Sequence, residues 1–119
     1  MAEKRMFAQR IVETDDFRDL TPKAQALYFH MGMQADDDGV VGNYRGIVLL
    51  CGCGRDELDE LVRTGYIQAL NDKAYVICHW HIHNNVPKKQ YKPSMFRDQL
   101  NGLMDLDEDG IYRPRSYLR

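Results

Sequence analysis

The sequence predicts a mainly α-helical α+β fold, and three features lead to that prediction. Apolar residues recur at helical spacing over 24–31, a second helical pattern over 55–65 has an acidic first turn and a glycine stop, and two strand-like runs follow it directly. The chain has 119 residues, of which 44% are hydrophobic and 29% are charged, which is typical of one globular domain. We therefore expect a single hydrophobic core.

The first helix is expected to begin at Thr21, because a Thr N-cap followed by Pro22 at the first helical position is a strong start signal. It should continue to about residue 34 with one buried stripe. That stripe is formed by Ala24, Leu27, Tyr28 and Met31. Residues 6–12, which precede the helix, keep neither a helical nor a strand period, and we expect a short edge strand or an extended arm there.

An acidic turn over residues 36–39 should follow the first helix, since Gly39 can adopt positive φ. Val40-Val41 after it is just long enough for one short strand. Asn43 is then expected to cap a second helix over 44–50, which ends in a flexible Gly-Cys-Gly turn suited to a helix-to-helix connection.

The third helix is expected from Arg55 to a stop at Gly65, with Leu58, Leu61 and Val62 facing inward. A hairpin of 66–70 and 73–80 should follow, joined by Asn71-Asp72. In its second strand, alternation places Val76, Cys78, Trp80 and Ile82 on one face and Ile77, His79, His81 and His83 on the other. Trp80 is expected to anchor the core.

A helix-turn-helix followed at once by a β-hairpin defines a winged helix, so we expect a winged helix-turn-helix of three helices with a hairpin wing and a C-terminal extension. The predicted boundaries are a winged-helix domain over 1–96 and a C-terminal helical and acidic tail over 97–119. A short helix is expected within 95–104, and residues 105–119 are expected to be a tail.

Four separated blocks of the sequence also resemble a known family. They are residues 24–39, Gly65-Tyr66-Ile67, residues 79–84 (HWHIHN) and residues 88–94 (KKQYKPS). In this order they resemble the N-terminal domain of phage replisome organiser proteins, similar to DnaD-type replication initiation proteins. The resemblance covers about residues 5–96 and implies a winged-helix fold, a role in starting phage or prophage DNA replication, and an assembly that leads to helicase loading. It implies no catalysis.

The formal net charge is -2, so any contact with nucleic acid must be local. The candidate DNA-binding residues are Lys88, Lys89, Tyr91, Lys92, Arg97, Arg55 and Arg63. Most of them lie in one segment where cations alternate with aromatic rings, which suits phosphates and exposed bases. The third helix is a weaker candidate for insertion into the major groove, because four acidic side chains would face phosphates. These are Asp56, Glu57, Asp59 and Glu60.

No cofactor or metal is expected. A zinc site is the less favoured interpretation of several histidines and cysteines, because their spacing lacks C-x2-C pairs. They are His79, His81 and His83, with Cys51, Cys53 or His30 as a further ligand. Residues 105–110 match only the first half of a calcium loop, since position twelve is Ser116 instead of Glu. We interpret Asp36-Asp37-Asp38 as a structural turn instead of a catalytic or Mg²⁺ site.

We expect a non-enzymatic replisome-organiser module for replication initiation that binds DNA weakly through phosphates, self-associates, or does both. Expected partners are DNA and replication-initiation or helicase-loading proteins. One alternative is an oligomerisation domain for helicase loading without DNA contact, and another is a winged-helix transcriptional regulator. No apolar run approaches the roughly 18 residues of a membrane span, and no signal-peptide pattern follows Met1, so a cytoplasmic location is expected.

Overall fold

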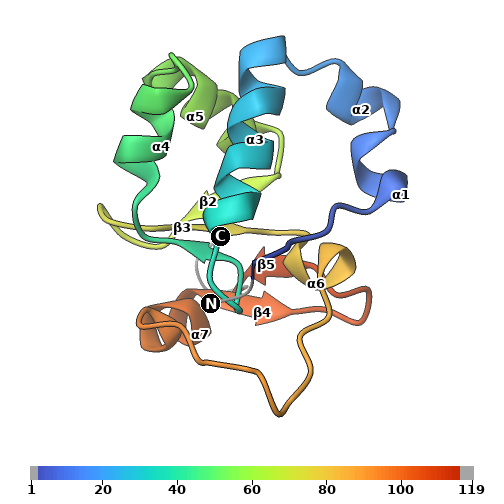
Figure 1. The fold of residues 1–119 in the computed structure, drawn as a ribbon, viewed down its shortest axis with the longest axis vertical. Helices are drawn as coiled ribbons and strands as arrows, with labels where there is room; N and C mark the ends of the chain where they lie inside the picture. Colours follow the sequence, from blue (N-terminus) through green and yellow to red (C-terminus); the bar gives the residue numbers. More distant parts are fainter. Residues whose placement is uncertain (1–2, 116–119) are drawn as a thin grey trace.

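Three helices cover one side of a small antiparallel sheet, and a hairpin with two further helices lies on the other side (Figure 1). The computed structural model describes residues 3–115. The upper helices are α3 (Pro22–Gln34), α4 (Tyr44–Leu50) and α5 (Arg55–Arg63). The lower elements are α6 (Trp80–His83), α7 (Arg97–Leu103), β4 (Met104–Leu106) and β5 (Tyr112–Pro114). The expected α+β class is confirmed.

Helix α3 begins where its start signal predicts. The Thr21 hydroxyl accepts a hydrogen bond from Ala24 N at 3.2 Å, and Pro22 occupies the first turn. Glu60 of α5 accepts from both Thr21 N and Thr21 Oγ1, at 2.7 and 2.8 Å. All four residues of the predicted stripe are buried, which confirms the face that α3 presents to the core: Ala24, Leu27, Tyr28 and Met31.

The sheet is formed by β1 (Val40–Val41), β2 (Ile67–Ala69) and β3 (Tyr75–Ile77) in the order β1-β3-β2, all antiparallel. Val40 pairs with Val76, and Gln68 pairs with Val76 from the other side. The predicted strand after the acidic turn and the predicted hairpin are therefore both present. Asn43 precedes α4 as expected, although its side chain makes no capping hydrogen bond.

The predicted second strand of the hairpin is too long. β3 ends at Ile77, and Trp80–His83 form the short helix α6, with Asn84 N donating to Trp80 O at 2.8 Å. The alternation predicted through Ile82 is therefore wrong. All three residues of β3 are buried because layers cover both of its faces, so inward and outward positions do not alternate there. Trp80 does anchor the core, at 1% exposure.

The N-terminal region contains helices that we did not predict. Residues 3–12 hold no strand, and α1 (Gln9–Val12) and α2 (Asp15–Arg18) precede α3. The edge strand is therefore wrong, because Phe7 turns inward onto the aromatic core at 5.0 Å from the Phe29 ring centroid. Residues 3–8 lie as an extended arm before α1.

The segment after residue 97 packs on the rest of the fold. α7 lies within the helix expected over 95–104, and β4 and β5 form a hairpin where we expected only an acidic tail. Asp107 turns this hairpin by accepting from Asp109 N and Ile111 N, both at 2.9 Å. Tyr112 then joins the hairpin to the core, since its N donates to Cys78 O at 2.8 Å. Residues 116–119 lie outside the described residues.

Candidate nucleic-acid interface

The predicted basic segment forms a long connection between α6 and α7, residues 84–96, which we term the lysine loop. It is fastened to the acidic turn of residues 36–39. The Tyr91 hydroxyl donates to the Asp38 carboxylate, 2.8 Å from Oδ1 and 2.9 Å from Oδ2, and Ser94 N donates to Oδ2 at 2.8 Å. Lys92 N donates to Asp37 Oδ2 at 3.0 Å. Asp36 Oδ1 accepts from Asp38 N and Val40 N within the turn itself, so all three aspartates have structural contacts, as the interpretation as a turn expected.

Arg97 completes this attachment from the start of α7. Its Nη1 lies 3.4 Å from Asp38 Oδ1 and also bonds the Tyr91 hydroxyl, while its guanidinium lies 5.6 Å from the Tyr91 ring centroid. Two candidate DNA-binding residues, Tyr91 and Arg97, are thus occupied in holding the loop in place. They position the loop, and a ligand would have to compete with these contacts for their polar groups.

The remaining cations of the loop are free. Lys88, Lys89 and Lys92 are all exposed, and none forms an ion pair with any residue from 3 to 115. The middle of the loop lies at the lower end of the molecule, on the other side of the sheet from α5 (Figure 1), and its last two residues, Met95 and Phe96, line a hollow together with α4. The fold therefore presents three exposed ammonium groups on one segment, with no ion pair inside the described range 3–115.

The two candidate arginines of α5 lie elsewhere. Helix α5 is at the opposite end of the molecule from the lysine loop (Figure 1), so Arg55 and Arg63 do not share a surface with the lysines. Arg55 also pairs with Asp59 at 3.3 Å in an exposed i,i+4 contact. The structure therefore separates the seven predicted residues into two groups.

The acidic character of α5 is partly structural. Glu57 accepts from Gly54 N at 2.7 Å and closes the start of its own helix, and Glu60 caps α3 as described above. Asp56 and Asp59 remain exposed on the outer face. A phosphate backbone approaching this face would meet two carboxylates.

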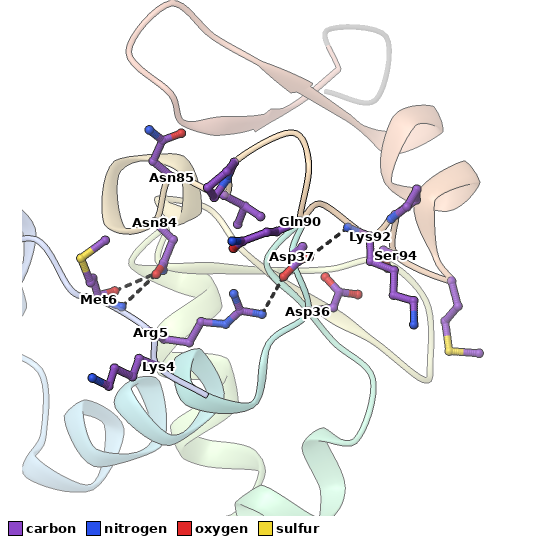
Figure 2. A pocket seen from close by; sticks show the side chains of 14 residues that line it. Lys4, Arg5, Met6, Asp36, Asp37, Asn84, Asn85, Gln90, Lys92 and Ser94 are labelled. Atoms are coloured by element: carbon purple, nitrogen blue, oxygen red, sulfur yellow. Dashed lines mark hydrogen bonds and ion pairs between the residues drawn. The ribbon is translucent and has the colours of Figure 1, made fainter. Parts of the chain in front are cut away.

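A groove borders the lysine loop that the sequence analysis did not find. We term it the arm groove, and it lies between residues 4–6 of the N-terminal arm and residues 84–95 of the lysine loop, with a volume of about 750 Å³ (Figure 2). Arg5 crosses it, and its Nη2 donates to Asp37 Oδ1 at 3.0 Å and to Ala35 O at 2.9 Å. The guanidinium also lies 5.0 Å from the Trp80 ring centroid. Arg5 is 30 or more residues from these partners, so no local signal indicated the contact.

The arm is held in place by His83 and Asn84. Ala8 N donates to His83 Nδ1 at 2.8 Å, and Met6 N donates to Asn84 Oδ1 at 2.8 Å. Because a backbone N–H can only donate, Nδ1 carries no proton, and the proton on Nε2 is donated to the Tyr28 hydroxyl at 2.6 Å. Burial, followed by the nearby His79, lowers the pKa of His83 from 6.5 to about 4.

We expect the fold to lose stability in mild acid. The unfolded chain takes up a proton at His83 near pH 6.5 and the folded chain only near pH 4. The contribution of His83 to the free energy of unfolding is therefore complete above pH 6.5 and is lost as the pH drops toward 4. The shift corresponds to about 3 kcal/mol. His83→Asn, which keeps an acceptor for Ala8 N but does not titrate, should flatten the dependence. Urea denaturation of both proteins from pH 7 to pH 4 measures the effect, and parallel curves would contradict it.

The side chains weighed for metal binding are dispersed or occupied. No group of three or more His, Cys, Asp or Glu in the part of the chain that the structure describes could hold a metal ion. His81 Nε2 bonds the Tyr112 hydroxyl at 2.8 Å, and Asp107 pairs with Arg113 at 2.6 Å. Burial raises the pKa of Cys78 to about 12, which suits a small apolar core residue and not a nucleophile.

An exposed apolar patch lies beside the loop. Leu49 and Leu50, at the end of α4, are 80% and 89% exposed, and Met95 is 87% exposed. Leu50 and Met95 both line a second hollow of about 600 Å³, and Met95 also lines the arm groove. The two hollows therefore adjoin at Met95.

Comparison with protein-family models, curated proteins and solved structures finds no match for this chain. Of the helices in residues 3–115, none has the length and apolar character needed to cross a membrane.

Proposed function

We propose that this chain is a winged helix-turn-helix module that binds DNA through phosphates. The order of elements supports this fold: α3, β1, α4, α5, β2 and β3 follow one another, and β1 joins the β2–β3 hairpin as the third strand. In a winged helix the hairpin directly after the third helix is the wing.

One observation carries the DNA-binding proposal, namely that the three lysines of the lysine loop are exposed and form no ion pair with residues 3–115. The attachment of Tyr91 and Ser94 to Asp38 fixes the loop backbone while the Lys88, Lys89 and Lys92 side chains stay exposed. Exposed ammonium groups attract phosphates, and the fixed backbone confines the entropy lost on binding to the lysine side chains. The exposed carboxylates of α5 disfavour insertion of that helix into the major groove of DNA. We therefore expect the affinity for DNA to depend only weakly on base sequence.

The biological role that we propose follows from the resemblance of residues 24–39, 65–67, 79–84 and 88–94 to phage replisome organisers. A module that holds DNA by its phosphates, without a catalytic step, suits an assembly that starts phage or prophage replication and prepares DNA for helicase loading. Its proposed partners are DNA and replication-initiation or helicase-loading proteins in the cytoplasm.

Charge reversal at the loop tests DNA binding. Lys88→Glu, Lys89→Glu and Lys92→Glu together should raise the Kd for random duplex DNA about 100-fold, since each lost contact costs about 1 kcal/mol near the surface. The slope of log K against log salt should fall by about 0.9 for each lost contact. Fluorescence anisotropy at several salt concentrations measures both quantities.

Three basic residues, one on each of α1, α2 and α3, provide a matched control for the charge reversal. Arg10, Arg18 and Lys23 are also exposed, and no ion pair joins them to any residue of 3–115. Reversing these three changes the net charge equally, far from the loop, and should change the Kd by only a fewfold. Equal losses in the two triple variants would show that total charge alone governs binding and would contradict the proposed site.

A second candidate function is self-association without DNA contact, favoured by the exposed Leu49, Leu50 and Met95. A second copy of the chain is the proposed occupant of this patch. Light scattering on the anisotropy samples separates the two functions. A defined oligomer that binds no DNA at low salt would favour self-association, whereas salt-sensitive binding by a monomer would favour the DNA-binding module.

A further inference from the structure

The arm groove is lined by segments that lie far apart in the sequence. Lys4, Arg5 and Met6 form one side, and the lysine loop forms the other, with Asp36 and Asp37 between them (Figure 2). Met6 is fixed on its side because the Asn84 amide pairs with both its N and its O, at 2.8 and 3.2 Å. The groove is therefore preformed and does not depend on a mobile arm.

The charged side chains that line the groove carry a net positive charge, since three are basic and two are acidic. Both Asp37 oxygens are occupied, Oδ1 by Arg5 and Oδ2 by Lys92 N, and Asp36 Oδ1 accepts from Asp38 N and Val40 N, each at 3.0 Å. Lys4 and Lys92 lie on the two sides and form no ion pair with the described residues.

A third cation lines the groove, and its hydrogen bonding is incomplete within residues 3–115. The Arg5 side chain is only 3% exposed, and although its Nη2 is bonded, its buried Nε has no partner among residues 3–115. Asp37 balances the charge of Arg5, so the positive surplus along the groove comes from Lys4 and Lys92, against which the lining sets only Asp36. An anionic chain fits this electrostatic arrangement.

The groove also offers groups that could contact bases. Asn85 and Gln90 are exposed, and their side chains make no hydrogen bond with the described part of the chain. Asparagine and glutamine amides both donate and accept, as base edges require. Five of the fourteen lining side chains are apolar and can cover the faces of bases. These are Met6, Val86, Pro87, Pro93 and Met95.

We propose that the arm groove binds single-stranded DNA, with phosphates on Lys4 and Lys92 and unstacked bases against Asn85, Gln90 and the apolar lining. Bases in a duplex are paired and stacked, so they cannot present their faces and Watson–Crick edges to one groove, whereas bases of a single strand can. This inference rests on the proposed DNA-binding function and deepens it, because Lys88 and Lys89 lie outside the groove lining and would serve duplex and single strand alike.

The test uses the intact chain with an oligodeoxythymidylate of about 15 nucleotides, within the usual range of single-strand site sizes, and a random duplex. Asn85→Ala with Gln90→Ala removes the amides without changing charge. It should weaken single-strand binding about tenfold, as loss of two hydrogen bonds predicts, and change duplex binding less than twofold. Gln99→Ala with Asn101→Ala is the matched control, since both residues are exposed on α7 outside the groove, and it should change neither.

The outcomes separate the two proposals. Unchanged single-strand affinity in the Asn85 and Gln90 variant, with binding still lost on reversal of Lys88 and Lys89, would overturn the groove and leave the DNA-binding module intact. Equal losses for single strand and duplex would also overturn it. Absence of binding to both DNAs by the unaltered chain would overturn both proposals. Photocross-linking of the oligonucleotide to residues 4–6 or 84–95 supports the groove independently.

Discussion

Gly39→Ala is expected to lower the free energy of unfolding by about 4 kcal/mol, because strain and a clash act together. Gly39 has φ 85°, where an L side chain is strained. A Cβ there would lie 2.5 Å from Trp80 Cγ. The indole cannot move away freely, since it is 1% exposed, its Nε1 donates to Asp37 O at 3.0 Å, and Arg5 lies against its ring.

Gly65→Ala is the control for this substitution. Gly65 has φ 87°, but apart from its two chain neighbours no atom of residues 3–115 lies within 4 Å of the added Cβ, so only backbone strain of about 1 kcal/mol is expected. The difference between the two variants in urea denaturation isolates the contact with Trp80. Equal destabilisation would show that the indole relaxes and would contradict the expected clash.

Asp38→Ala is expected to cost about 4 kcal/mol as well, because Tyr91 Oη and the buried Ser94 N both lose a charged acceptor and each such loss costs about 1.5–3 kcal/mol. Arg97 adds little, since its side chain is 46% exposed. The lysine loop should lose its attachment to the acidic turn, so amide exchange at Ser94 should become fast.

Asp38→Asn separates shape from charge. One amide oxygen can still accept from Ser94 N and Tyr91 Oη, so we expect about half the loss of stability and slow exchange at Ser94. Hydrogen exchange and urea denaturation on both variants measure these effects. Fast exchange at Ser94 in the unaltered chain would show that Asp38 does not hold the loop.

The elements with strong local signals were predictable. Thr21 and Pro22 mark the start of α3, and the stripe from Ala24 to Met31 identifies its buried face, because capping and helical periodicity depend on residues within one or two turns. The acidic turn with positive φ at Gly39 and the β2–β3 hairpin were predictable for the same reason.

The end of β3 was not predictable by the same means. Alternation holds only where one face of a strand is solvated, and Tyr75, Val76 and Ile77 are all buried between layers. The aromatic and imidazole residues that follow suit a strand locally, yet α6 begins at Trp80, whose side chain is buried against Gly39.

Of the candidate site, the sequence by itself determined where the cations are and that Lys88, Lys89 and Lys92 share one segment. Only the tertiary structure decided their roles. It assigns Tyr91 and Arg97 to Asp38, more than 50 residues away, places Arg55 and Arg63 at the other end, and joins Lys4 and Arg5 to the loop. Such contacts depend on which surfaces the core brings together, and no local pattern of residues encodes that.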